Sequence, residues 1–133
     1  MTSALDVLHS LRIEDGRRWG QAAYAFQRED AEAILRGEPP FHFLTHARGS
    51  SKTGDQAGIV LSLLLTVGAR ERIYWLAADQ EQGQLCIDSI RGFVDRTPRL
   101  RRWCNASTAT PRIGQHGSGS SVQSEAEQPR WFR

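Results

Sequence analysis

Residues 41–67 read FHFLTHARGSSKTGDQAGIVLSLLLTV, and this stretch decides the predicted fold. Residues 41–45 are aromatic and aliphatic and follow a Gly-Glu-Pro-Pro breaker, so we expect them to form a strand. Residues 46–54 are small and polar, as in a loop. Residues 55–67 are apolar nearly all round, which is typical of a helix that is buried on most sides.

A second strand and helix are predicted to follow. Residues 73–78 form a short apolar run that is rich in strand formers. Asp79 would cap the next helix, with Gln82 placed as in a capping box, and Pro98 would end that helix. This alternation predicts a parallel sheet with crossover helices. We therefore expect an α/β fold, a three-layer α/β/α architecture like that of the P-loop NTPases, incomplete at its C-terminal side.

The chain has 133 residues, which is enough for one domain. Residues 1–37 are predicted to be a helical lead-in, because Leu5, Leu8 and Leu11 recur at helical spacing. Residues 41–112 would form a βαβα core, so that 1–112 make a partial P-loop ATPase domain. In residues 113–133 the apolar pattern fails and Gly, Ser and Gln dominate, which predicts a disordered or frameshifted tail.

Composition places few limits on function. The net charge of +2 does not mark the chain as a nucleic-acid binder. The two cysteines lack the spacing of a zinc site and are expected to be free thiols in a reducing compartment. No signal peptide or membrane span is visible, so we expect a cytoplasmic protein that does not contact a membrane.

The loop before the apolar helix resembles a phosphate-binding loop. The standard pattern, G-x-x-x-x-G-K-[ST] between a strand and a helix, is matched at its end by Lys52 and Thr53. His46 and Ser51 replace its two glycines, and Gly49 lies inside the loop instead. Serine adopts positive φ less readily than glycine, which is expected to weaken phosphate affinity. A bare Ser-Lys-Thr also occurs in ordinary solvated loops, whereas the expected strand-loop-helix context favours phosphate binding.

Three segments together resemble the large subunit of phage terminases, the motor that pumps double-stranded DNA into a capsid. Residues 46–53 are similar to the deviant phosphate loop of that family, which has an arginine near its start. Residues 19–35 resemble the entry segment of these proteins, and residues 74–84 resemble their second strand and the start of the next helix. The resemblance covers residues 17–104 and rests on the order and spacing of the segments.

The resemblance implies roles for matching positions. Lys52 would bind phosphate, and Thr53 would bind phosphate and Mg²⁺. Arg48 would be the catalytic residue that stabilises charge on the γ-phosphate, and Gln27 would contact adenine through its amide. Backbone N–H donors would come from Gly49, Ser50 and Ser51. The implied cofactors are ATP and Mg²⁺, and the implied partners are double-stranded DNA, the portal and the small terminase subunit in the host-cell cytoplasm.

Each of these roles has a simpler alternative. Arg48 would otherwise be a solvated loop cation, and Gln27 a surface residue of a helix. Asp79 is expected to cap a helix, not to bind metal. The arginines between 96 and 102 are expected to form a solvated helix end, with DNA contact as the alternative.

One part needed for hydrolysis is missing from the sequence. ATP hydrolysis needs an apolar strand that ends in an acidic pair, to hold Mg²⁺ and to orient water. No such run follows Trp103, and the family's nuclease domain is absent too. We therefore expect a truncated or frameshifted terminase-like product that hydrolyses ATP poorly or not at all, with exposed apolar surface and possible self-association. The alternative is a non-catalytic remnant or interaction module that binds no nucleotide.

Overall fold

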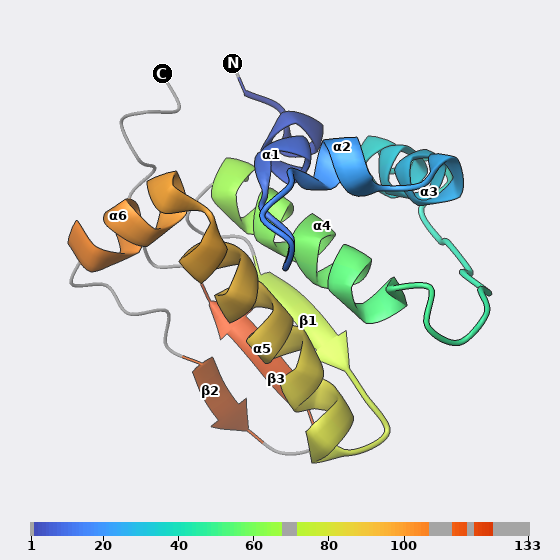
Figure 1. The fold of residues 1–133 in the computed structure, drawn as a ribbon. Coiled ribbons are helices and arrows are strands. Elements are labelled where there is room, and N and C mark those ends of the chain that lie inside the picture. Colours follow the sequence, from blue (N-terminus) through green and yellow to red (C-terminus); the bar gives the residue numbers. More distant parts are fainter. Residues whose placement is uncertain (1, 68–71, 107–112, 117–118, 124–133) are drawn as a thin grey trace.

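The computed structural model describes residues 2–67, 72–106, 113–116 and 119–123 (Figure 1). Helices make up most of the described chain. Their bounds are α1 (Ala4–Ser10), α2 (Trp19–Ala22), α3 (Ala25–Arg36), α4 (Lys52–Thr66), α5 (Gln80–Arg96) and α6 (Pro98–Ala106). The strands are β1 (Arg72–Leu76), β2 (Ile113–His116) and β3 (Gly119–Gln123).

The helix α4 is the centre of the fold. It packs against α1 and α3 on one side and against α5 on the other (Figure 1). Its sequence explains this position, because Ala57, Ile59, Leu61 and Leu65 are all buried. The contact with α1 is close, since a Cβ on Gly58 would lie 2.9 Å from Cδ1 of Leu8. The predicted buried helix is therefore confirmed, although it begins at Lys52.

The predicted helical lead-in is present as three helices. Ser3 and Asp6 form a capping box that starts α1. Leu8 and Leu11, two of the leucines at helical spacing, are fully buried. Residues 12–18 then form a tight hairpin closed by an antiparallel bridge between Arg12 and Arg18.

The helix α5 starts as predicted and is followed by a further helix, α6, that the sequence did not predict. Asp79 accepts a hydrogen bond from the Gln82 backbone N–H at 2.8 Å, so it caps α5. The helix ends at Arg96, and Pro98 opens a further helix, α6. Proline suits the first position of a helix, because its missing N–H would have no partner within the helix.

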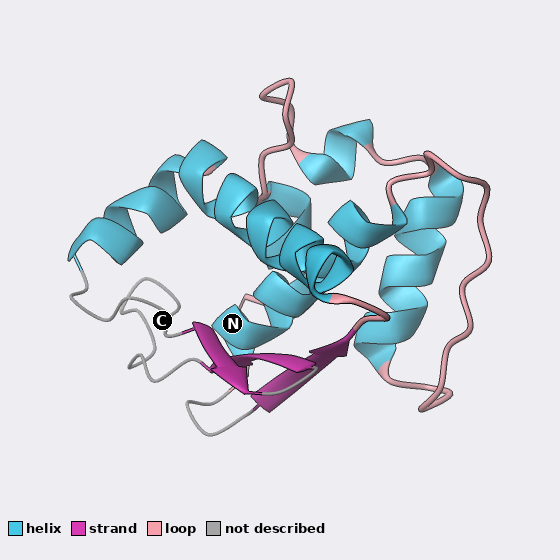
Figure 2. Cartoon of the chain, turned by 90° about the horizontal axis from the view of Figure 1, so that it is seen from below, coloured by secondary structure: helices cyan, strands magenta, loops and turns pink. Residues whose placement is uncertain are grey.

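The predicted three-layer α/β/α fold with a parallel sheet is wrong. β1 pairs with β3, and β3 pairs with β2, and both pairings are antiparallel. Residues 41–45 form no strand, and Phe41 and Phe43 are 88% and 91% exposed. The strands gather on one side of the helices, away from that segment (Figure 2). A parallel pair would need residues 41–45 beside β1, and the aromatic and aliphatic composition of 41–45 alone cannot ensure that.

The structure describes only part of the predicted tail, and it allows a search for membrane-spanning helices in the described residues. β2 and β3 lie within residues 113–133, the segment predicted to be a disordered or frameshifted tail, and the rest of that segment lies outside the description. Across the described part of the chain, none of the helices has the length and apolar character needed to cross a bilayer.

Candidate functional site

The loop before α4 is built from a tight turn and two residues with positive φ. The Ser50 backbone N–H donates to the Ala47 carbonyl at 3.3 Å, and the Ser50 hydroxyl donates to the same carbonyl at 2.8 Å. Gly49 has φ +84° and Ser51 has φ +60°. Ser51 therefore occupies the left-handed conformation that the replaced glycine of the standard pattern would adopt easily.

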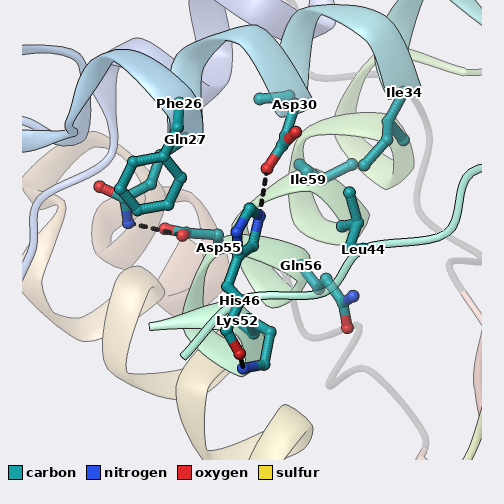
Figure 3. Close-up of a pocket in the computed structure, with 11 residues that line it drawn as sticks. Phe26, Gln27, Asp30, Ile34, Leu44, His46, Lys52, Asp55, Gln56 and Ile59 are labelled. Atoms are coloured by element: carbon teal, nitrogen blue, oxygen red, sulfur yellow. Dashed lines mark hydrogen bonds and ion pairs between the residues drawn. The ribbon is translucent and has the colours of Figure 1, made fainter. Parts of the chain in front are cut away.

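The Lys52 side chain folds back over this loop. Its Nζ donates to the carbonyl of His46 at 2.5 Å and to the carbonyl of Ala47 at 3.1 Å (Figure 3). An ammonium group has three N–H donors, so one donor of Lys52 is left for a further acceptor. The contact places the positive charge of Lys52 at the start of α4.

The N-terminus of α4 adds donors at the same place. The N-cap residue, Ser51, makes no side-chain hydrogen bond to the first turn. The first N–H groups of a helix have no partner within the helix, and the helix dipole favours negative charge there. Thr53, the second residue of α4, is half-buried. This end of α4 therefore has the chemistry of an anion site.

A buried hydrogen-bond network fixes the other side of the first turn of α4. Asp55 accepts hydrogen bonds from Trp19 Nε1 at 2.8 Å and from Gln27 Nε2 at 2.6 Å. The Gln27 Oε1 atom accepts from the Tyr24 backbone N–H at 2.8 Å. Burial raises the pKa of Asp55, and the two hydrogen bonds oppose that rise. The network ties α2 and α3 to α4.

A second carboxylate lies close to the loop. Asp30 on α3 is 2.6 Å from His46 Nε2, and the His46 ring packs against Phe26 with ring centroids 4.9 Å apart (Figure 3). Asp30, Asp55 and Lys52 therefore line the same pocket. Negative charge on the two acidic residues would oppose the binding of an anion there.

The pocket among these residues is small. Its space amounts to about 20 Å³, which is room for one water molecule. Small-molecule pockets usually measure about 300–1,000 Å³, so a nucleoside would have to lie outside this pocket or displace the chain around it.

The structure brings most of the predicted site residues together at the N-terminal end of α4. Lys52, Thr53 and the backbone of residues 49–51 lie at the helix start. Arg48 is exposed, and no hydrogen bond or ion pair joins its side chain to the rest of the described chain. Gln27 is buried and its amide is occupied at both ends, so the surface-residue alternative does not describe it.

Sequence reasoning missed the residues that hold the first turn of α4 in place. Asp55 was counted as the start of an apolar helix, and its acidic side chain in the first turn was the only local sign of a role. Its partners Trp19 and Gln27 are 36 and 28 positions away, and no spacing rule links positions so far apart. His46 was interpreted as a plain loop residue, and its pairing with Asp30 was not foreseen.

The described residues contain no other centre of metal or thiol chemistry. Nowhere in that part of the chain do three or more His, Cys, Asp or Glu side chains gather to hold a metal ion. Cys86 and Cys104 are free, as predicted. Burial raises the pKa of Cys86 to about 11, so this thiol is unreactive near neutral pH.

Comparison of the chain with known protein families, curated proteins and solved structures finds no match.

Proposed function

We propose that this chain is the ATP-binding part of a motor that packages double-stranded DNA into phage capsids, similar to the terminase large subunit. The observation that carries the proposal is the position of Lys52. Its ammonium lies against the carbonyls of its own loop, at the uncapped start of a 15-residue helix. A lysine held there faces the place where a helix N-terminus would receive phosphate.

The side chains of the loop would divide the work of binding. Lys52 would give its third donor to a phosphate oxygen, while the N–H groups of Gly49, Ser51 and the first turn would contact the others. The Ser50 N–H would first have to release the Ala47 carbonyl. The hydroxyl of Thr53 would be a ligand of the Mg²⁺ that accompanies ATP. Arg48 would reach the γ-phosphate from the exposed side of the loop.

We assign Gln27 a positioning role. Its amide is already bonded to Tyr24 and Asp55, so contact with adenine would require both bonds to break. Breaking them would leave buried polar groups unpaired at a cost of about 1–3 kcal/mol each. Gln27 instead holds α3 against the first turn of α4, which orients the loop.

The proposal includes binding but little hydrolysis. Asp79, which follows β1, is used as a helix cap. β2 and β3 read IGQH and GSSVQ, and they contain no acidic residue. Among the described strands, none therefore supplies the carboxylate that holds Mg²⁺ in such motors. DNA, the portal and the small terminase subunit remain proposed partners, and the host-cell cytoplasm the proposed location.

A second candidate is a non-catalytic interaction module without nucleotide binding. It is favoured by the pocket of about 20 Å³ and by the two carboxylates, Asp30 and Asp55, that line it. Exposed aromatic side chains at Phe41, Phe43 and Tyr74 would suit self-association or a protein partner.

Calorimetric titration with ATP and Mg²⁺ separates the two candidates. We expect micromolar binding that weakens at least tenfold in Lys52→Ala, the loss expected for a charged hydrogen bond. The matched control is Arg36→Ala, which removes one exposed positive charge at the far end of α3. No binding at millimolar ATP, or equal weakening in both variants, would reject the ATP site and favour the interaction module.

A further inference from the structure

A groove lies between α1, the hairpin of residues 12–18 and the junction between α5 and α6. It has a volume of about 370 Å³, which falls in the usual range for small-molecule sites. Its lining residues include Thr2, Ser10 and Thr97. The groove is therefore much larger than the pocket beside Lys52.

Arginine side chains gather in this groove. Arg12, Arg18 and Arg99 all line it, and Arg12 and Arg18 are held side by side by their antiparallel bridge. The opposing acid in the wall is Asp6, which accepts hydrogen bonds from the Ser3 N–H at 3.0 Å and the Ser3 hydroxyl at 2.8 Å. The guanidinium groups of Arg12 and Arg18 against one capped carboxylate favour an anionic ligand.

The frame of the groove is fixed by contacts between distant parts of the chain. The Arg12 backbone N–H donates to Thr97 Oγ1 at 3.1 Å, and Arg96 Nε donates to the Arg12 carbonyl at 3.2 Å. The Arg12 guanidinium also donates to the Gly16 carbonyl at 2.8 Å, which holds it within the hairpin. Binding would therefore need little rearrangement of the wall.

The junction between α5 and α6 forms one wall of the groove. Pro98, Arg99 and Leu100 form the first turn of α6, and all three line the groove. The C-terminal end of α5 lies at the same junction and carries partial negative charge, which offsets the partial positive charge at the start of α6. The case for an anionic ligand therefore rests on the arginine side chains.

We propose that this groove binds a phosphate group. Planar guanidinium groups match phosphate oxygens in pairs, and neighbouring arginines neutralise a doubly charged group better than one cation does. The phosphate would come either from a small phosphorylated molecule or from the backbone of a nucleic acid. The proposal is independent of the ATP site, because the two sites share no residue.

Titration of the Lys52→Ala chain with pyrophosphate tests this groove without the contribution of the loop. We expect saturable binding that weakens about tenfold in Arg18→Ala, since a hydrogen bond to a charged group contributes about that factor. Arg18 is exposed and outside the packed core, so its removal should leave the fold intact. The matched control is Arg17→Ala, because Arg17 is the next residue, carries the same charge, and pairs with Asp15 outside the groove.

Competition with a short DNA duplex identifies the source of the phosphate. Displacement of pyrophosphate by the duplex, with an affinity that falls steeply with salt, identifies a nucleic-acid backbone. Retention of pyrophosphate against the duplex identifies a small phosphorylated ligand. Absence of pyrophosphate binding, or equal weakening in Arg17→Ala and Arg18→Ala, would overturn the proposal.

Discussion

The first turn of α4 has two sides that are held in different ways. On one side, Asp55 receives hydrogen bonds from Trp19 and Gln27, which lie 36 and 28 positions away. On the other side, Lys52 donates to the carbonyls of His46 and Ala47, which lie 6 and 5 positions away. Trp19 is 3% exposed, whereas Arg48 and Gly49 are open to solvent.

The contrast indicates that the Asp55 side is a fixed scaffold and that the Lys52 side can change its contacts. The Asp55 side belongs to the core and opens only when helices separate. On the loop side, the bonds of Lys52 and Ser50 are local, and one link to α3 runs through His46 and Asp30. The local bonds can be exchanged for bonds to a ligand without separating the helices. Ligand-binding loops are generally drawn from such low-stability regions. The predictions below test whether the two sides respond as differently as their contacts imply.

The largest effect is expected from Asp55→Ala. This change leaves the indole N–H of Trp19 and the amide of Gln27 without their acceptor, which costs about 2–4 kcal/mol in free energy of unfolding. Urea denaturation measures the loss, and the Trp19 indole signal in NMR should shift. Asp88→Ala, which removes an exposed carboxylate from α5, should cost less than about 0.5 kcal/mol. Similar losses in the two variants would contradict a scaffold role for Asp55.

A smaller effect is expected from Gly49→Ala on the loop side. Gly49 has φ +84° and no atoms near its missing Cβ, so the cost is conformational and amounts to about 1–2 kcal/mol. The indole signal of Trp19 should not move, because the strain stays local. A shifted Trp19 signal in this variant would show that the two sides are coupled, and the comparison would fail.

A gain in stability is expected from Ser51→Gly. Ser51 has φ +60°, which glycine adopts without strain, so the free energy of unfolding should rise by about 0.5–1 kcal/mol. The same change restores the glycine of the standard phosphate loop and should tighten ATP binding. Thermal unfolding measures the first effect and calorimetry the second. A destabilised variant would mean that the Ser51 side chain is needed where it stands.

The smallest effect is a pH dependence of stability from Asp55. Burial raises its pKa in the folded chain above the ordinary value of 3.8, so the folded state binds its proton more tightly than the unfolded state. Its contribution to stability is therefore greatest below the unfolded pKa and declines as the pH rises toward the folded pKa. Asp6 and Asp15 have lowered pKa values and act in the opposite direction.

The difference in free energy of unfolding between the wild-type chain and Asp55→Asn isolates the pH-dependent contribution of Asp55. Stability curves should show the wild-type chain losing stability relative to Asp55→Asn as the pH rises above 3.8. A difference that is constant across this range would show that Asp55 has an unshifted pKa.

Local patterns predicted the helices well and the sheet poorly. Helical periodicity is a pattern among neighbours in the sequence. It therefore predicted the burial of Leu8, Leu11 and the apolar run in α4. The cap at Asp79 was also predicted, since a cap involves residues three apart. Pairing of strands depends on which segments meet in space, and the aromatic and aliphatic run of residues 41–45 carried no information about that.

The candidate site divides along the same line. The loop and its lysine were predictable, because the motif is a continuous stretch of sequence. The Asp55 network and the three-arginine groove were not, because their members come from α1, the 12–18 hairpin, α3 and the α5–α6 junction. A site whose residues come from distant segments has no fixed spacing in the sequence, so it cannot be predicted from a sequence motif.

The most direct test of the central claim uses the fact that Lys52 is the only lysine in the chain. A sample labelled with ¹⁵N at the lysine side chain gives one ammonium signal in NMR, and that signal belongs to Lys52. We predict that ATP with Mg²⁺ shifts this signal saturably and that adenosine leaves it in place, because the contact is to phosphate. A signal that stays unmoved at saturating ATP would contradict the account.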